Sequence, residues 1–265
     1  VFSSIDQYEL IMVDDGSPDE SWKIMNELYQ QYPHVKLIKL SRNFGSHAAI
    51  LAGLNECSGD CAVVKAADCQ EPASLILEMY SKWQEGYKVV LAERQSRHDG
   101  KMTNASAQQY YQIVRRFALK NMPENGFDVY LIDRQVIEVL RGLDEKNSAL
   151  TLQVLWTGYR TAIVEYDRIA RQEGESKWTL AKKVKLAVDS VVSFSFMPIR
   201  AITYTGFLVF CISIIWAIIV IINRFTGHIH VAGYTTLAII ILLSTGLIML
   251  TLGILGEYIW RTMDN

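Results

Sequence analysis

Two long uncharged runs near the C-terminus restrict the fold of this 265-residue chain more than any other feature. Neither Ala201 to Ile222 nor Val231 to Gly256 contains a charged residue. Each run is long enough, as a helix, to cross about 30 Å of hydrocarbon. A short connection from Asn223 to His230 joins them, so residues 199–261 are predicted to form a transmembrane hairpin. The alternative is a pair of buried helices, but a soluble core rarely needs two such runs side by side.

The distribution of positive charge around the hairpin predicts its orientation. The connecting loop has only Arg224 and two histidines, whereas the terminal side carries Lys182, Lys183, Lys185, Arg200 and Arg261. An excess of Lys and Arg marks the cytoplasmic side of a membrane protein. The chain is therefore predicted to be integral to the cytoplasmic membrane, with both termini and residues 1 to about 198 in the cytoplasm.

The segment directly before the hairpin, residues 179–198, is predicted to be an amphipathic helix. Leucine and valine side chains spread around it together with three lysines, and Pro198 is expected to end it before the first span. This composition suits a helix that lies on the membrane surface. A helix packed on the preceding domain is the alternative.

Upstream, short apolar runs alternate with helical segments. Strands are expected at residues 9–13, 35–40, 62–66, 87–92, 127–132 and 161–165, and helices at residues 18–31, 46–57, 72–83 and 102–120, with Asp133 and Arg134 capping a further helix. Strand, turn and helix repeat three times, which is typical of a parallel sheet with right-handed crossovers. Residues 1–178 are therefore predicted to form one α/β domain with a mostly parallel sheet.

Three polar turns follow the first three predicted strands. They carry Asp14 and Asp15, then Arg42 and Asn43, then Asp68 and Gln70. In parallel sheets, ligands bind beyond the carboxyl ends of the strands, although acidic turns there are also common helix caps. The oxygen ligands of Asp68 and Gln70 suit a hard cation such as Mg²⁺ or Mn²⁺ that holds phosphates.

Two further loops carry closely spaced cations. One contains Arg94 and Arg97, and the other contains Arg168, Arg171, Ser176 and Lys177. One guanidinium group can bind two oxygens of a phosphate through parallel hydrogen bonds, so these loops are predicted to bind phosphate. The alternative is that they are ordinary solvated loops. A net charge of −2 gives no reason to expect nucleic-acid binding. The four cysteines show no zinc spacing and are expected to be reduced.

Five segments, in this order, resemble the family-2 glycosyltransferases of the GT-A fold that act on polyprenyl phosphates. They are Val-Asp-Asp-Gly-Ser (13–17), Ser-Arg-Asn-Phe-Gly (41–45), Ala-Asp-Cys-Gln-Glu-Pro (67–72), Gly-Glu-Ser-Lys-Trp (174–178) and Leu-Gly-Glu-Tyr-Ile (255–259). The group includes dolichol-phosphate mannose synthase and the bacterial undecaprenyl-phosphate glucosyl- and aminoarabinosyl-transferases, which share a two-helix hairpin. The resemblance implies a Rossmann-like GT-A domain, a role in making cell-envelope polysaccharide, and an extra N-terminal strand that is missing here.

The resemblance also implies roles for individual residues. Asp14 and Asp15 would contact the base and ribose, with Arg42 and Asn43 nearby, and Asp68 and Gln70 would bind the metal. Asp128 would act near the acceptor, so Asp68 and Asp128 are the expected catalytic residues, and Arg168 and Arg171 match arginines of the second cationic loop. The chain departs from the pattern twice: Ala66 replaces an aspartate, and Phe-Asp-Val-Tyr (127–130) replaces a Gly-Asp-Phe-Arg-like segment.

The expected activity is transfer of one sugar from a nucleotide-sugar, a UDP-sugar by preference, to a membrane polyprenyl phosphate. One alternative is a catalytically degenerate, membrane-tethered nucleotide-sugar binding protein. The other is a processive polysaccharide synthase, which predicts further spans and a Gln-x-x-Arg-Trp motif that the sequence lacks. Gly246, Gly253 and Gly256 in the second span could allow close helix packing in a homo-oligomer.

Overall fold

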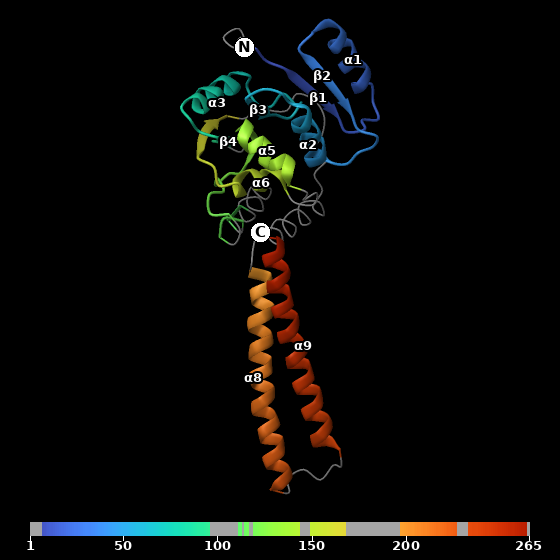
Figure 1. Ribbon diagram of the computed structural model, residues 1–265, viewed down its shortest axis with the longest axis vertical. Coiled ribbons are helices and arrows are strands. Elements are labelled where there is room, and N and C mark those ends of the chain that lie inside the picture. Colours follow the sequence, from blue (N-terminus) through green and yellow to red (C-terminus); the bar gives the residue numbers. More distant parts are fainter. Residues whose placement is uncertain are drawn as a thin grey trace. The chain divides into compact units, whose positions relative to one another are not determined.

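The computed structural model describes residues 7–95, 111–112, 114–116, 119–143, 149–167, 197–226 and 233–263. The chain divides into two compact units, Val1–Ser193 and Phe194–Asn265 (Figure 1). The first unit contains the mixed α and β elements and the second contains two long helices. The predicted α/β class is therefore confirmed for the first unit.

The first unit contains six strands and five helices within the described residues. In chain order they are β1 (Leu10–Asp14), α1 (Ser21–Gln31), β2 (Val35–Lys39), α2 (Ser46–Glu56), β3 (Cys61–Val64), α3 (Ser74–Gln84), β4 (Val89–Arg94), β5 (Phe127–Asp133), α5 (Arg134–Gly142), α6 (Leu150–Trp156) and β6 (Thr161–Tyr166). Each predicted strand is present, shifted by at most two residues, whereas α6 was not predicted. The helix expected at 102–120 lies mostly outside the described residues, as does the surface helix expected at 179–198.

The strands form a mixed arrangement and not the mostly parallel sheet that the sequence predicted. β1 and β2 form a parallel pair, and the other four strands form a sheet in the order β3-β5-β4-β6. β5 runs antiparallel to both β3 and β4, whereas β4 and β6 are parallel. The repeat of strand, turn and helix ends at β4, and the chain then re-enters the sheet from the edge at which β4 ended. That return makes β5 antiparallel to its two neighbours.

The strand directions bring four strand ends to one edge of the sheet. β3, β4 and β6 run in the same sense, so their carboxyl ends share this edge with the amino end of the antiparallel β5. The turn after β3 contains Asp68, β4 ends at Arg94, and β5 begins at Phe127, directly before Asp128. The topology thus gathers chemically active side chains that are far apart in the sequence.

The sheet is held between helices. α3 contributes Leu75 and Met79 to a buried cluster with Val90, Val129 and Val164 of three neighbouring strands. α5 packs against β3 and β5 and buries Val136, Ile137 and Leu140. Each fully buried aliphatic side chain of this kind stabilises a fold by roughly 1.5–3 kcal/mol. The packing of α3 and α5 therefore holds the strands, and the strand ends at the edge of the sheet, in place.

Asp133 connects the end of β5 to the start of α5, as the sequence predicted. Its Oδ1 accepts a hydrogen bond from the Gln135 N–H at 3.0 Å, which is an N-cap. Its Oδ2 accepts from Trp83 Nε1 at 2.8 Å and from Lys88 Nζ at 2.9 Å. Burial by itself raises the pKa of Asp133, but these three donors outweigh it and the pKa is lowered.

Glu9, just before β1, connects the start of the domain with β2 and with the turn before β3. Its carboxylate lies 2.5 Å from Lys36 Nζ and accepts hydrogen bonds from the N–H groups of Ser58 and Gly59 and from the Ser58 hydroxyl. Partial burial by itself raises the pKa of Glu9. The bonds from Lys36, Ser58 and Gly59 favour the charged form more strongly and bring the pKa to about 2.

We expect Glu9→Gln to lower the free energy of unfolding by about 1–3 kcal/mol near neutral pH. Because the folded pKa lies below the ordinary value of 4.5, this stabilisation is present above pH 4.5 and is lost as the pH falls toward 2. Denaturant unfolding of the two proteins at several pH values should therefore show curves that converge in acid. The exposed Glu27 of α1 provides a control, since Glu27→Gln should change neither the stability nor its pH dependence. A constant difference between the Glu9→Gln protein and the wild type across this range would contradict the expectation.

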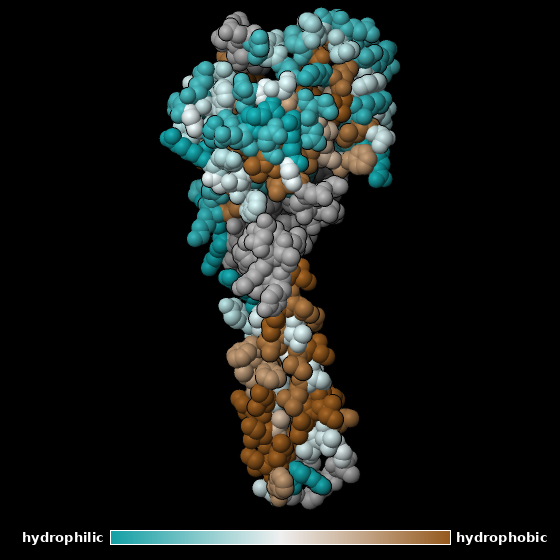
Figure 2. All heavy atoms as spheres, viewed as in Figure 1, coloured by the Kyte–Doolittle hydropathy of each residue, from teal (hydrophilic) through white to brown (hydrophobic). Residues whose placement is uncertain are grey.

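The second unit contains α8 (Met197–Phe225) and α9 (Tyr234–Met263). Within them, Arg200–Phe225 and Thr235–Gly256 are long and apolar enough to cross a membrane, with mean hydropathies of 2.8 and 2.6. Only 22% and 11% of these stretches are buried, so most of their apolar side chains face outward (Figure 2). Pro198 lies in the first turn of α8, where its missing N–H costs no helical hydrogen bond. Its expected role in ending the preceding helix concerns residues outside the described part of the chain.

Glycines allow α8 and α9 to pack closely. A Cβ added at Gly246 would lie 2.8 Å from Phe210 Cα, and one at Gly253 would lie 2.7 Å from Thr203 Cα. Gly206 of α8 makes the reciprocal close approach to Met249, where a Cβ would lie 2.9 Å from the carbonyl carbon. Gly246 and Gly253, which the sequence suggested for contacts between subunits, are therefore used inside the hairpin.

Candidate functional site

Asp14 ends β1 and is 3% exposed. Its Oδ1 accepts a hydrogen bond from the Ser17 N–H at 3.0 Å. Its Oδ2 is also buried and has no hydrogen-bond partner among the described residues. A buried acceptor without a donor is costly, so Asp14 Oδ2 is suited to accept from an N–H or O–H group of a ligand.

Asp15 joins the turn after β1 to the turn after β2. Its two carboxylate oxygens accept from the N–H groups of Phe44 at 2.7 Å and Gly45 at 2.9 Å. The structure thus brings together the first two of the three polar turns. Both carboxylate oxygens of Asp15 thus accept from backbone N–H groups of the second turn, so Asp15 links the two turns.

Gly16 lets the same two turns approach each other. Its φ is +68°, a left-handed conformation that glycine adopts without strain. A Cβ at this position would lie 2.7 Å from the carbonyl carbon of Arg42 and 2.8 Å from the nitrogen of Asn43. Arg42 and Asn43 themselves are exposed, and the Arg42 guanidinium lies 4.8 Å from the centre of the Phe44 ring.

The third polar turn follows β3. The half-buried Asp68 accepts from the Gln70 N–H through Oδ1 at 3.4 Å, and Gln70 is 8% exposed. Between them, Cys69 has a φ of +56°, which is uncommon for a residue other than glycine. Such conformations gather at functional sites, where the surrounding structure holds them in place.

The carboxylates around this turn decide how a divalent cation would fit. Glu71 has a side chain only 2% exposed, and its Oε2 lies 3.5 Å from Lys65 Nζ without a hydrogen-bond partner among the described residues. Among the described residues, no three His, Cys, Asp or Glu side chains come together in a way that could hold a metal ion. Asp68 and Gln70 therefore fit an ion that takes most of its ligands from phosphate and water, and not one held by protein groups alone.

Arg94 and Asp128 form an ion pair at the same edge of the sheet. The Arg94 side chain is 10% exposed, whereas that of Asp128 is 53% exposed. Ala92 pairs with Val129 and Glu93 pairs with Phe127, which leaves Asp128 in a β-bulge. Bulges often turn a side chain toward an active site. Separate roles were expected for these two residues from the sequence, and the structure brings them into contact.

Tyr130 stands where the resemblance placed an arginine. It is fully buried, and burial raises the pKa of its phenol. Its hydroxyl has no hydrogen-bond partner among the described residues. Tyr130 therefore belongs to the core and offers no cation at the edge of the sheet.

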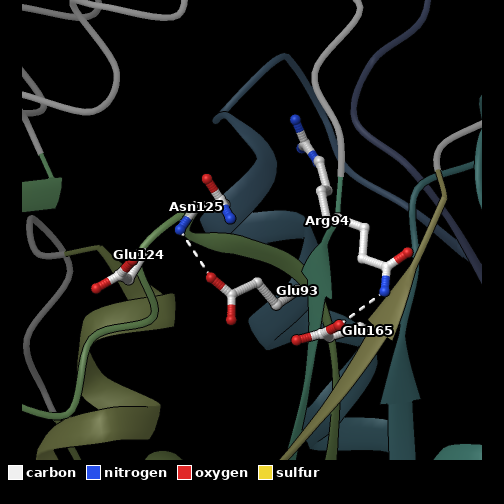
Figure 3. A pocket seen from close by; sticks show the side chains of 6 residues that line it. Glu93, Arg94, Glu124, Asn125 and Glu165 are labelled. Carbon is white, nitrogen blue, oxygen red and sulfur yellow. Dashed lines mark hydrogen bonds between the residues drawn. The ribbon is translucent and has the colours of Figure 1, made fainter.

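A cavity of about 410 Å³ lies beside the ion pair (Figure 3). Its lining consists of Glu93, Arg94, Gln95, Glu124, Asn125 and Glu165. The Asn125 N–H donates to Glu93 Oε1 at 2.8 Å, and Gln95 Nε2 donates to Glu165 Oε2 at 2.8 Å. Of these residues the sequence singled out only Arg94. Glu93 and Glu165 lie at the ends of parallel strands, so the reasoning that identified Asp14 could have found them too.

The other predicted site residues lie outside the described part of the chain. They are Arg97, Arg168, Arg171, Ser176 and Lys177. Their assignment to phosphate binding therefore stays a prediction.

Comparison with known proteins identifies the family. The family described as "Glycosyl transferase family 2" matches residues 1–141. The chain is 37% identical to the glycosyltransferase YkcC of Bacillus subtilis, over 98% of this chain and 81% of that protein. It is 35% identical to the bactoprenol glucosyl transferase of Shigella phage SfV, over 96% of this chain and 83% of that protein.

A solved structure, the mannosyltransferase PcManGT from Pyrobaculum calidifontis in complex with GDP-Man and Mn²⁺, aligns with 97% of this chain and 70% of its own. That alignment has 15% identity and a TM-score of 0.43. The sequence relatives cover almost the whole chain, and the family match includes the three polar turns and the Asp128 bulge. This protein is therefore a glycosyltransferase and belongs to glycosyltransferase family 2.

Proposed function

We propose that this protein transfers a single sugar from a nucleotide-sugar, a UDP-sugar by preference, to the phosphate of a membrane polyprenol. Family membership supports sugar transfer, and relatives named bactoprenol glucosyl transferases support a polyprenyl phosphate as the acceptor. The structural observation that supports the donor site is the buried Oδ2 of Asp14 beside the joined turns, which has no hydrogen-bond partner in the described part of the chain. The two candidate membrane spans suit a lipid acceptor.

The donor would bind where the first two turns meet. Asp14 Oδ2 is available to accept from an N–H or O–H of the nucleoside, and Asp15 keeps the Arg42–Asn43 turn in place through the backbone of Phe44 and Gly45. Arg42 and Asn43, which are exposed there, would contact the nucleotide. Asp68 and Gln70 would hold Mg²⁺ or Mn²⁺ together with the diphosphate. When bound, such an ion supplies Lewis-acid stabilisation of the leaving group.

The chemical step exchanges one bond at the anomeric carbon for another. An oxygen of the polyprenyl phosphate forms a bond to that carbon, the bond to the β-phosphate oxygen breaks, and the electron pair leaves with the nucleoside diphosphate. The acceptor is already an anion at neutral pH, so strong base catalysis is not required. Asp128 would orient the acceptor or take a residual proton. Arg94, Arg97, Arg168, Arg171 and Lys177 are predicted to offset the repulsion between the two phosphate groups, and Ser176 is predicted to bind phosphate.

Under this proposal, each of three segments of the chain has its own role. Residues 1–178 would form the catalytic domain, residues 179–198 an interfacial helix, and residues 199–261 the membrane hairpin. With both termini and the catalytic domain in the cytoplasm, the site would meet a lipid phosphate at the cytoplasmic face. A homo-oligomer would have to use surfaces other than Gly246 and Gly253.

The full-length protein in membranes or nanodiscs, supplied with Mn²⁺ or Mg²⁺, is expected to form a lipid-linked sugar from at least one nucleotide-sugar. The product should require added polyprenyl phosphate, and extraction into organic solvent followed by mass spectrometry would identify it. Water in place of the polyprenol phosphate serves as the control acceptor. Nucleotide binding without any product across the common UDP-, GDP- and dTDP-sugars would exclude the transferase. That result would instead support a binding protein, the alternative that Ala66 and the departure from the family pattern around Asp128 motivate.

A further inference from the structure

Lys65 brings a positive charge to the third polar turn. It directly follows β3, which ends at Val64, and it is the only basic residue between Val63 and Pro72. Its ammonium nitrogen lies 3.5 Å from Glu71 Oε2 and 3.5 Å from the carbonyl oxygen of Ala66. Both distances are long for a hydrogen bond, and an ammonium group has three donors. Lys65 can therefore donate a shorter bond to a bound anion.

The two ends of the Lys65–Glu71 ion pair differ in exposure. The Glu71 side chain is 2% exposed, whereas that of Lys65 is 24% exposed. A buried carboxylate is costly without a cation nearby, and Glu71 Oε2 has no hydrogen-bond partner in the described part of the chain. The attraction between the two charges therefore keeps the partly exposed ammonium of Lys65 at the turn that also carries Asp68 and Gln70.

Strand register places Lys65 on the same side of the sheet as Arg94. Val63 of β3 and Ala92 of β4 pack against the same buried cluster, to which α3 contributes. Side chains two residues apart along a strand share a face, so Lys65 and Arg94 continue this side at the edge of the sheet. Because β5 lies between β3 and β4, these two strands are about 10 Å apart. Two long cationic side chains can reach one diphosphate across that span.

The charge of Lys65 matters because of its neighbour Ala66. The resemblance to polyprenyl-phosphate transferases implies an aspartate at position 66, which would place a negative charge next to Lys65. With alanine there, the third turn has one carboxylate fewer to attract a divalent ion, and the adjacent ammonium is offset by Glu71 alone among the charged residues 63–72. The substitution thus shifts the charge of the turn in the direction that favours an anionic ligand.

We propose that the Lys65 ammonium binds the diphosphate of the nucleotide donor and supplies, together with the divalent ion, the positive charge on this side of the site. This inference rests on the proposed function, which places the donor diphosphate at the third turn. Glu71 holds Lys65 in place from the buried side. Lys65 stays protonated throughout, so its contribution is a charge-assisted hydrogen bond and not a proton transfer.

Nucleotide binding to the full-length protein tests this role without any turnover. UDP, GDP and dTDP are titrated first, and the tightest binder is then compared with its own nucleoside, in EDTA and in Mn²⁺. In EDTA, Lys65→Gln is expected to weaken binding of the diphosphate about 10-fold or more and to leave binding of the nucleoside within about twofold, because only the phosphates lose a charged partner. Lys65→Arg should keep most of the affinity. Mn²⁺ should narrow the difference between Lys65→Gln and the wild type, since it neutralises the same phosphates.

Two further variants separate phosphate binding from a purely structural role of the ion pair. Lys65→Gln combined with Glu71→Gln removes both charges, so it would restore the affinity for the diphosphate if Lys65 only neutralised Glu71. We expect the loss to remain. Lys88→Gln is the matched control, because Lys88 also pairs with a buried carboxylate, that of Asp133 at 2.9 Å, but lies before the opposite end of β4. It should lower the stability and leave the affinity for the diphosphate unchanged.

The possible results distinguish this inference from the proposed function. Unchanged affinity for the diphosphate in Lys65→Gln, or recovery of that affinity in the double variant, would overturn the inference. Absence of binding of all three diphosphates to the wild type would overturn it together with the donor site. Binding that depends on Lys65, without any lipid-linked sugar product from the wild type, would support the inference and refute only the proposed transfer.

Discussion

Asp68→Asn is expected to lower the transferase turnover by about 100-fold or more, a loss comparable to removing one key electrostatic group from an active site. The third polar turn has two carboxylates, those of Asp68 and Glu71, and the buried Glu71 carboxylate lies 3.5 Å from Lys65 Nζ. Position 66, where the resemblance to polyprenyl-phosphate transferases implies a further aspartate, is alanine. The amide of asparagine keeps the shape of the side chain but removes the negative charge that would draw a cation to the donor diphosphate.

The measurement is the initial rate of lipid-linked sugar formation at several Mn²⁺ concentrations. Asp60→Asn is the matched control, since Asp60 is an exposed aspartate directly before the same strand, at its opposite end, and it should leave the rate unchanged. Far-ultraviolet circular dichroism of both variants checks that the α/β domain is folded. A rate within about threefold of the wild type would show that Asp68 does not bind the cation, and it would move the metal site to another part of the protein.

Gly16→Ala is expected to damage both the fold and the donor site. The left-handed backbone costs alanine roughly 1–2 kcal/mol, and the added Cβ would meet backbone atoms of Arg42 and Asn43 at 2.7 and 2.8 Å. Backbone atoms cannot move aside as a flexible side chain can, so the two turns must separate. That separation would pull Phe44 and Gly45 away from Asp15. We therefore expect a loss of stability of about 2–4 kcal/mol and at least tenfold weaker binding of UDP.

Gly86→Ala separates the two causes of this damage. Gly86 also has a positive φ, +95°, but a Cβ there would meet nothing within 4 Å. This variant should show the cost of the backbone conformation alone, roughly 1–2 kcal/mol, with unchanged nucleotide affinity. Chemical unfolding gives the stability and titration with UDP gives the affinity. If Gly16→Ala bound UDP as tightly as Gly86→Ala, the close approach of the two turns would not matter for the donor.

Local patterns predicted much of this domain correctly. The apolar runs gave the positions of all six described strands, and Asp133 was identified as a helix cap before its hydrogen bond to Gln135 was known. Both predictions succeed because an apolar run and a helix cap each depend on residues only a few positions apart in the sequence. The helix α6 was missed, since its seven residues are too few to display a helical period.

The candidate site was predicted less completely, because its parts are joined by contacts across long stretches of sequence. The sequence found Asp14, Asp15, Asp68 and Asp128 from their places beside strands. The roles of Arg94 in phosphate binding and of Asp15 in nucleotide binding stay predictions. The structure adds that Arg94 forms an ion pair with Asp128, 34 positions away along the chain, and that both oxygens of Asp15 accept from backbone N–H groups of the next turn. Neither partner can be read from a local pattern.

By itself, the sequence determined the α/β class, the three polar turns and the two candidate membrane spans, since each of these follows from the order and spacing of apolar, glycine and acidic residues. It pointed to the family through the resemblance of its motifs to known members. Only the tertiary structure decided the direction of β5, the bulge at Asp128 and the contact between Asp128 and Arg94. The physical reason is that strand direction depends on which edge of the sheet the chain re-enters. The charge of a buried arginine is then matched by whichever carboxylate that path brings within reach.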